Sequence, residues 1–317
     1  MLLGPTGTGK TELAVSVARR IGAEIIGCDA LQIYREFDIA TAKPCAEDRR
    51  RVPHHLVDAL DPRTDVNMAG YVEAADRCIA EIHGRGAVPM VVGGTGMYLR
   101  GLLRGVVRTP PRNREIRERL RRVERRRGAG SLHRWLARRD PESAGRIAPA
   151  DTQRVVRALE LALSGGPTWS QRLDKEGSWN RARERYAALK IGLDMDRQLL
   201  RAGLDRRVDR FFEEGLVAEV RSLLERGIPP EANAFKAIGY RELLAVPEAA
   251  RETLAVREEV KRSTRRYAKR QRTWFRREPG VHWLDAARAT SELTEIVVER
   301  WLRFTRGSGM DPAAGSV

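Results

Sequence analysis

The segment Gly4-Pro5-Thr6-Gly7-Thr8-Gly9-Lys10-Thr11 decides the fold class of this 317-residue chain. It fits the phosphate-loop pattern G-x-x-x-x-G-K-[ST], in which glycines let backbone N–H groups turn toward one point. The N-terminus of the following helix adds partial positive charge there, and the Lys10 ammonium adds a full charge. The Thr11 hydroxyl can hold Mg²⁺. The segment therefore predicts a site for a di- or triphosphate with magnesium as cofactor.

The sequence around this loop alternates between strand and helix patterns. Residues 1–3 are the end of an apolar strand, and residues 11–21 have the spacing of an amphipathic helix. Short apolar runs at 23–28 and 87–92 predict two more strands, with a helix at 69–83 between them. This order is typical of an α/β fold, a P-loop NTPase-like core of parallel strands flanked by helices.

The composition changes in the middle of the chain. Residues 112–127 hold nine Arg and three Glu, and helical spacing continues over 131–164. We therefore expect a mainly helical insertion at 105–186, which ends in a loop at 164–186, and a catalytic core made of 1–104 and 187–304. The second part of the core is predicted to contain strands at 187–193 and 281–284 and helices at 196–226, 240–246, 248–277 and 290–304. Residues 305–317 are rich in Gly, Pro and Ser and predict a disordered tail.

The charge balance indicates a polyanionic partner. Lys and Arg number 59 against 43 Asp and Glu, which gives a formal net charge of +16, and such an excess favours nucleic acid. Cys28, Cys45 and Cys78 form neither a C-x-x-C pair nor a zinc pattern, so we expect a reducing cytoplasm. Because no apolar run reaches about 18 residues, we expect no membrane span. A monomer is the expected state.

A phosphate loop most often binds ATP or GTP, usually with an acidic residue at the end of a second strand to hold the metal. Here the apolar run 87–92 is followed by Gly93-Gly94-Thr95 and has no acid at its end. The remaining candidate is Asp29, which closes the run 23–28. The missing acid disfavours an NTPase, although a small-molecule kinase remains an alternative.

Several further segments carry a resemblance to one family. Asp29-Ala30-Leu31-Gln32-Ile33-Tyr34-Arg35 is similar to D-S-x-Q-x-Y-[RK], and Gly93-Gly94-Thr95-Gly96-Met97-Tyr98 to G-G-T-G-x-Y. The others, in chain order, are residues 39–44 (IATAKP), 53–58 (PHHLVD), 151–160 (DTQRVVRALE), 236–241 (KAIGYR) and 270–276 (RQRTWFR). With the phosphate loop, they resemble the tRNA dimethylallyltransferases over about residues 1–285. Gly27 and Ala30 stand where that family has serines.

The resemblance implies an activity and its partners. The family transfers dimethylallyl from dimethylallyl diphosphate to the exocyclic amine (N6) of the adenine adjacent to the anticodon on its 3′ side, and it releases diphosphate. It implies Asp29 as the general base and Thr95 as a second catalytic residue near the transfer site. It also implies binding of diphosphate by residues 4–11 and Arg207. The partner is the anticodon stem-loop of tRNA.

The same resemblance implies a set of tRNA contacts. They are Asp29, Ala30, Leu31, Gln32, Thr95, Arg117, Gln153, Arg154, Val155, Val156, Arg157, Lys236, Ala237, Ile238, Gly239, Tyr240 and Arg241. Residues 257–277, which carry ten Lys and Arg, could also line a face that binds the RNA backbone.

Other functions remain open at this point. A small-molecule kinase would need an acid near the metal and a pocket for a nucleotide base. An adenylate isopentenyltransferase, which modifies free nucleotides, shares the loop and the aspartate but should lack a large basic helical insertion. A nucleic-acid-binding protein without enzymatic activity would need neither Lys10 nor Asp29.

Overall fold

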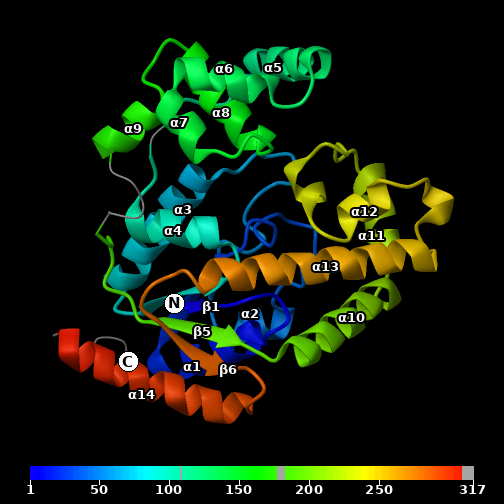
Figure 1. Cartoon of the computed structure of the whole chain (residues 1–317). Coiled ribbons are helices and arrows are strands. Elements are labelled where there is room, and N and C mark those ends of the chain that lie inside the picture. Colours follow the sequence, from blue (N-terminus) through cyan, green and yellow to red (C-terminus); the bar gives the residue numbers. More distant parts are fainter. Residues whose placement is uncertain (108, 177–182, 309–317) are drawn as a thin grey trace. The chain divides into compact units, whose positions relative to one another are not determined.

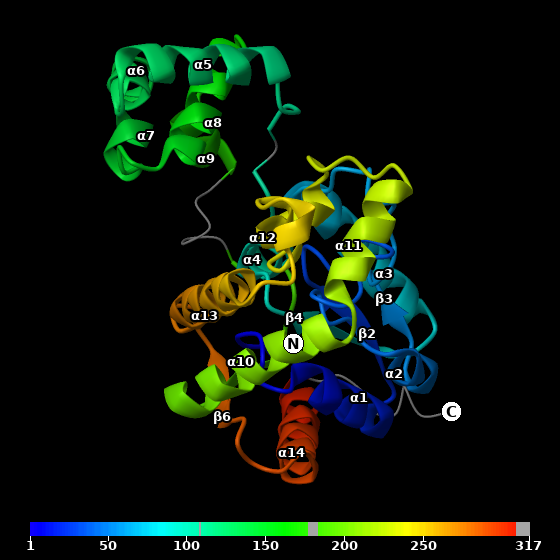
Figure 2. The same ribbon diagram turned by 90° about the vertical axis from the view of Figure 1, so that its right-hand side faces the viewer.

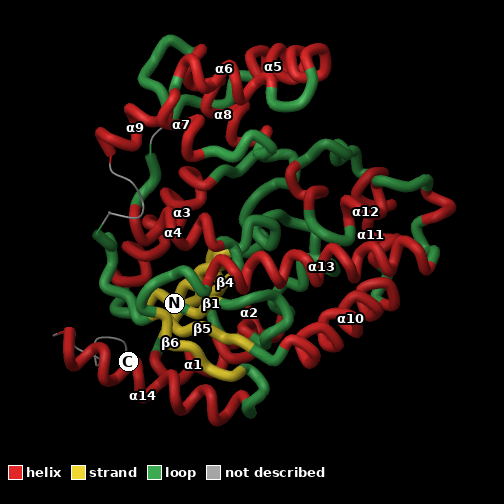
Figure 3. Tube along the Cα trace, in the orientation of Figure 1, coloured by secondary structure: helices red, strands yellow, loops and turns green. Residues whose placement is uncertain are grey.

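A computed structural model of the chain describes residues 1–107, 109–176 and 183–308. Its centre is a six-stranded sheet in the order β3-β2-β4-β1-β5-β6, with every neighbouring pair parallel (Figures 1 and 3). The strands are β1 (Leu2–Leu3), β2 (Ala23–Cys28), β3 (His54–His55), β4 (Val88–Gly93), β5 (Lys190–Asp194) and β6 (Val281–Asp285). The predicted α/β class and parallel core are confirmed. The two-residue strand β3 was not predicted because it is too short to show a periodic pattern.

The short strand β1 lies in the middle of the sheet. Leu2 is paired with Val92 of β4 on one side and with Ile191 of β5 on the other. Both leucines of β1 are buried, as expected for a parallel strand covered on both faces. This position fixes the phosphate loop, which follows β1 directly, at the centre of one sheet edge.

Helices cover the sheet, and several of the predicted ones are confirmed to within one or two residues. The helices of this unit are α1 (Lys10–Ile21), α2 (Ala46–Arg51), α3 (Met68–Gly84), α4 (Gly96–Arg104), α10 (Arg197–Glu213), α11 (Leu216–Glu225), α12 (Tyr240–Leu244), α13 (Leu254–Phe275) and α14 (Thr290–Ser308), with 3-10 turns at Asn233–Lys236 and Glu248–Ala250. Helix α14 packs on α1, and α10 packs on α13, as both views show (Figures 1 and 2).

The segment 196–226, predicted to hold one long helix or two, forms two helices, because Gly215 takes a left-handed conformation (φ 93°) between them. Two other boundaries differ from the predictions. The predicted helix 248–277 begins only at Leu254, after a 3-10 turn that follows Pro247. Helix α14 continues to Ser308, and burial of Thr305 keeps its last turns attached, so the predicted tail begins too early. Residues 309–317 of that tail lie outside the described residues.

The chain separates into two compact units. One is Met1–Leu103 together with the chain from Tyr186 onward, and the other is Arg104–Arg185, close to the predicted 105–186. The second unit contains α5 (Arg114–Arg127), α6 (Ser131–Arg139), α7 (Pro141–Arg146), α8 (Thr152–Leu163) and α9 (Trp169–Glu176). Leu120, Leu136 and Leu159 lie in its own apolar core.

Helix α9 falls inside the predicted loop 164–186, so that prediction is wrong for Trp169–Glu176. The preceding Gly165-Gly166-Pro167 suggested an irregular segment that would continue, but it ends within a few residues. Residues 177–182 of the predicted loop lie outside the described residues. Among the helices that are described, none is both long and apolar enough to cross a bilayer.

Close packing against backbone and side chains explains the glycines at the end of β4 and directly after it. A Cβ on Gly93 would lie 2.2 Å from the carbonyl oxygen of Cys28, and a Cβ on Gly94 would lie 2.2 Å from Nε2 of Gln271. A Cβ on Gly96 would lie 2.4 Å from the ring of Trp274. The G-G-T-G segment and the R-Q-x-T-W-F-R segment are therefore packing partners across the fold.

We expect Gly93→Ala to lower the free energy of unfolding by about 1–3 kcal/mol or more, because the added methyl group meets a backbone carbonyl that cannot rotate away. The matched control is Gly84→Ala at the end of α3, where no atom lies within 4 Å of the new Cβ. The control should be neutral or gain up to about 1 kcal/mol from helix propensity. Urea unfolding followed by circular dichroism measures both, and equal midpoints would contradict this account.

Candidate functional site

Three functional segments meet because their strands are neighbours. The phosphate loop follows β1, Asp29 follows β2 and Thr95 follows β4, and the sheet order β2-β4-β1 places these carboxyl ends side by side. Ligands of open parallel sheets bind at this edge. A cavity of about 470 Å³ lies there, and it is lined by Lys10 and Asp29 together.

Most of the predicted site residues of the core unit line this cavity. They are Thr6, Gly7, Gly9, Lys10, Thr11, Asp29, Leu31, Gln32, Arg207, Lys236, Ala237, Ile238 and Arg241. Thr95 does not line it, but its Oγ1 accepts a hydrogen bond from the N–H of Ala30 at 3.1 Å, directly beside Asp29. The lining residues that were not predicted individually as site residues include Lys43, Tyr267, Arg270 and Gln271. The sequence signal for the last two was their place in the R-Q-x-T-W-F-R segment.

The phosphate loop is shaped by its own contacts. Gly7 and Gly9 have φ values of 86° and 74°, so the turn needs glycine at both. The Lys10 ammonium donates to the carbonyl of Pro5 at 2.7 Å, and the Thr8 hydroxyl donates to the same oxygen at 2.9 Å. Pro5 has no N–H, so its predicted part in binding diphosphate is limited to shaping the loop. The Thr8 side chain is buried, so Thr8 offers diphosphate its backbone N–H alone.

Positive charge exceeds negative charge inside this cavity. Burial, followed by the charge of nearby Arg207, lowers the pKa of Lys10 to about 7, while Asp29 opposes the shift. The pKa of Arg207 is also lowered, first by burial and then by Arg210, and Asp29 again opposes the shift. Two cations thus share one carboxylate in a partly desolvated space. A polyanion bound there would relieve the repulsion between them.

Asp29 is held by its backbone neighbours. Its Oδ1 accepts hydrogen bonds from the N–H groups of Leu31 at 2.9 Å and Gln32 at 3.3 Å, which fixes the carboxylate in an Asx turn. Among the described residues, no hydrogen bond to Oδ2 is present. The second oxygen is therefore available to a ligand in the cavity.

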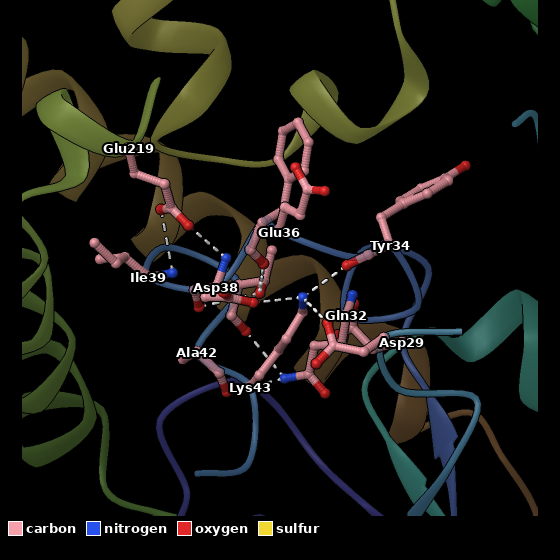
Figure 4. Close-up of polar contacts among 12 residues, drawn as sticks. Asp29, Gln32, Tyr34, Glu36, Asp38, Ile39, Ala42, Lys43 and Glu219 are labelled. Atoms are coloured by element: carbon pink, nitrogen blue, oxygen red, sulfur yellow. Dashed lines mark hydrogen bonds and ion pairs between the residues drawn. The ribbon is translucent and has the colours of Figure 1, made fainter. Parts of the chain in front are cut away.

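The segment from Asp29 to Lys43 is held by a polar network, which Figure 4 shows. The Lys43 ammonium, with its side chain only 4% exposed, donates to Asp58, to the Tyr34 carbonyl at 2.6 Å and to Asp38 at 2.6 Å. Gln32 donates through Nε2 to the carbonyls of Thr41 and Ala42, both at 3.0 Å. Gln32 therefore presents its amide oxygen, and not its N–H groups, for a predicted contact with a base.

Glu219 supports the same segment from α11. Its carboxylate accepts from the N–H of Asp38 at 2.7 Å, from that of Ile39 at 3.3 Å and from the Tyr240 hydroxyl at 2.9 Å. Burial raises the pKa of Glu219. Figure 4 shows this carboxylate pointing at the loop.

Tyr240 is consequently a core residue. Its side chain is 0% exposed, and its ring centroid lies 4.9 Å from that of Phe37. Because the side chain is fully buried, the predicted contact of Tyr240 with tRNA would fall to its backbone, and it stays a prediction. Gly239 is also buried, since a Cβ there would lie 2.8 Å from that of Ala40. Within this predicted set, Lys236 and Arg241 keep charged groups at the cavity.

The predicted contacts in the insertion fall into two groups. Gln153 and Arg154 are exposed, with 76% exposure for the Arg154 side chain. Val155 and Val156 have their side chains buried in the insertion core, so their predicted contact with tRNA would fall to the backbone and stays a prediction.

Arg117 and Arg157 are both tied to the buried carboxylate of Glu160, at 3.4 Å and 2.9 Å. Arg157 also donates to the Pro110 carbonyl at 2.7 Å. These two arginines are therefore oriented by the protein before any ligand arrives.

The residues present suit a magnesium ion that is bound mainly through a ligand. Among the described residues, no group of three His, Cys, Asp or Glu side chains could hold a metal by itself. Thr11 lines the cavity next to Lys10. A hydroxyl together with phosphate oxygens and water is a common Mg²⁺ environment, since this ion is rarely enclosed by protein ligands alone.

Comparison with known proteins gives one consistent family. Residues 32–278 match the IPP transferase family, and residues 1–58 match the isopentenyl transferase family. The tRNA dimethylallyltransferase of Geobacter sulfurreducens is 43% identical over 285 residues, which cover 90% of this chain and 91% of that protein. That of Symbiobacterium thermophilum is 43% identical over 311 residues, with 95% of both chains covered.

Solved structures agree with these sequence matches. The full-length tRNA isopentenylpyrophosphate transferase of Bacillus halodurans superposes with a TM-score of 0.70 at 34% identity, covering 97% of this chain and 98% of that one. A eukaryotic dimethylallyltransferase acting on tRNA gives a TM-score of 0.80 at 26% identity, covering 98% of this chain and 79% of that one.

The lowered pKa of Lys10 generates a test with inorganic diphosphate. At about pH 8 the Lys10 side chain should be mostly the neutral amine in the ligand-free protein. A bound polyanion favours the charged ammonium, so Lys10 should take up close to one proton on binding. Calorimetry in buffers of different ionisation enthalpy counts that proton. Lys10→Arg is the control, because its side chain stays charged. The unchanged chain should take up more protons than Lys10→Arg at about pH 8. This difference should shrink at about pH 6, because Lys10 is already charged below its pKa. Equal proton counts for both proteins at the higher pH would contradict the prediction.

Proposed function

The chain belongs to the IPP transferase family, and we propose that its cavity holds dimethylallyl diphosphate beside the adenine 3′-adjacent to the anticodon of tRNA. The activity is that of a tRNA dimethylallyltransferase, a prenyltransferase. One observation carries the proposed site. Lys10, Arg207 and Asp29 line a single cavity, so a diphosphate group and a proton acceptor lie within reach of one reaction.

The diphosphate end of the donor lies on the phosphate loop. Breaking the bond between the allylic carbon and oxygen places negative charge on diphosphate and positive charge on the allyl group. Lys10, Arg207 and the N–H groups of residues 7–11 stabilise that negative charge. Each such preorganised contact is commonly worth about 3 kcal/mol in the transition state.

Magnesium would be held by the Thr11 hydroxyl and by diphosphate oxygens. When bound, it neutralises charge on the leaving group.

Asp29 is the proton acceptor for the nucleophile. The exocyclic amine of adenine is weakly nucleophilic because its lone pair is conjugated with the ring. As N6 bonds to the allylic carbon, one N–H proton moves to Oδ2 of Asp29, while Oδ1 stays with Leu31 and Gln32. Thr95 holds the N–H of Ala30 and thereby the neighbouring turn. The adenine must leave the base stack of the anticodon loop to reach this position, which costs about a few kcal/mol.

The alternatives have less support. A kinase is disfavoured because β4 ends at Gly93 and Gly94 follows, without an acid at that place. An adenylate isopentenyltransferase has no use for an insertion with exposed arginines such as Arg154. The relatives that span most of the chain are named for tRNA and not for free nucleotides. That the enzyme is a monomer and that it lies in the cytoplasm both stay predictions.

Asp29→Asn should reduce prenyl transfer to tRNA by about 10²–10⁴-fold, the usual range for general-base catalysis. Asparagine keeps an oxygen for the N–H groups of Leu31 and Gln32 but cannot take the amine proton, so the turn should survive. Single-turnover transfer from labelled dimethylallyl diphosphate with Mg²⁺ measures the loss. The binding constant for tRNA serves as the folding control and should change little. Transfer at the unchanged rate would remove Asp29 from this role.

Arg154→Ala should weaken tRNA binding and reduce the slope of log Kd against log salt by roughly 0.7–0.9, the value for one lost phosphate contact. The matched control is Arg303→Ala on α14, where the side chain is 75% exposed and, like that of Arg154, pairs with an acid three or four residues earlier. Filter binding across a salt series distinguishes them. If both variants behave alike, Arg154 makes no specific contact with tRNA.

A further inference from the structure

Gln271 of α13 connects two segments of the site, and the transfer chemistry above gives it no role. Its side chain is 6% exposed. Its Oε1 accepts from the N–H of Thr6 in the phosphate loop at 2.8 Å, and its Nε2 donates to the carbonyl of Gly94 at 2.9 Å. A single amide thus joins a loop near residue 6 to the segment before Thr95.

This contact determines what the phosphate loop can do. The N–H of Thr6 donates to Gln271, so this amide is already engaged and the predicted contact of Thr6 with diphosphate falls to its side chain. The loop is instead held at a fixed separation from Gly94. A Cβ at Gly94 would lie 2.2 Å from Nε2 of Gln271, so any other residue there would displace this amide.

An amide of this length satisfies both partners, whereas a shorter amide or an ionised carboxylate does not. The site requires one acceptor, for Thr6, and one donor, for Gly94, in one planar group. Asparagine is one methylene too short, and a carboxylate offers two acceptors and would repel the Gly94 carbonyl. A protonated carboxylic acid, however, has one acceptor and one O–H donor and would restore both hydrogen bonds.

We propose that Gln271 is a positioning residue that sets the distance between the phosphate loop and the Gly94-Thr95 segment, and so the placement of the donor's diphosphate against the transfer site. The proposal rests on the proposed function, because it assigns the loop to a prenyl diphosphate. It predicts that substitution of this amide weakens binding of the diphosphate donor and leaves the Kd for tRNA unchanged.

Gln271→Glu tests the proposal through its pH dependence. At about pH 8 the introduced carboxylate should raise the KM for dimethylallyl diphosphate and the Kd for inorganic diphosphate roughly tenfold, as expected for two lost hydrogen bonds. Burial favours the neutral acid, so the ratio to the unchanged chain should fall toward unity near about pH 6. Gln271→Met keeps the length without either hydrogen bond, and its ratio should stay constant with pH.

Two further measurements keep the test decisive. Gly94→Ala pushes on the same amide from the opposite side and should raise the donor KM as Gln271→Met does, while Kd for tRNA stays unchanged in every variant. Equal ratios for the Glu and Met variants at every pH, or a loss confined to tRNA binding, would overturn the role of Gln271. If the unchanged chain binds inorganic diphosphate but transfers no prenyl group, the proposed function fails, and the Kd series still tests Gln271.

Discussion

The site depends on the partial burial of two cations beside one carboxylate. Lys10 and Arg207 repel each other, and both have lowered pKa values, with burial as the main cause. Asp29 compensates only part of this charge. The ligand-free cavity therefore has unfavourable electrostatics that a diphosphate would correct, and the same interaction would strengthen as negative charge develops on the leaving group. Binding and catalysis then draw on one feature of the fold.

The parallel sheet provides that arrangement. The β2-β4-β1 order brings three segments that are far apart in sequence to one edge, and Gly93 at the end of β4 lets its backbone approach that of Cys28 closely. The network around Lys43 and Glu219 then fixes the loop that carries Asp29 (Figure 4). The loops at this edge are held in place by these hydrogen bonds between side chains and backbone.

Much of this was predictable, for identifiable reasons. Phosphate-loop spacing and apolar runs predicted the parallel core, and the charged segment 112–127 indicated the insertion. The resemblance to a family supplied Asp29 and Arg207, which the structure places in the cavity. Burial was not predictable in the same way, because a motif does not say which face a side chain occupies. Val155, Val156 and Tyr240 belong to matched segments yet pack in cores. Gln271 was in a quoted segment, but its partners lie more than a hundred residues away in sequence.

A crystal structure of the chain with an anticodon stem-loop and an unreactive thio-analogue of dimethylallyl diphosphate tests the central claim most directly. The account predicts diphosphate oxygens on Lys10 and Arg207, and the amine of an unstacked adenine within about 3 Å of Oδ2 of Asp29. A diphosphate bound away from Lys10, or an adenine amine facing a different acid, would contradict it.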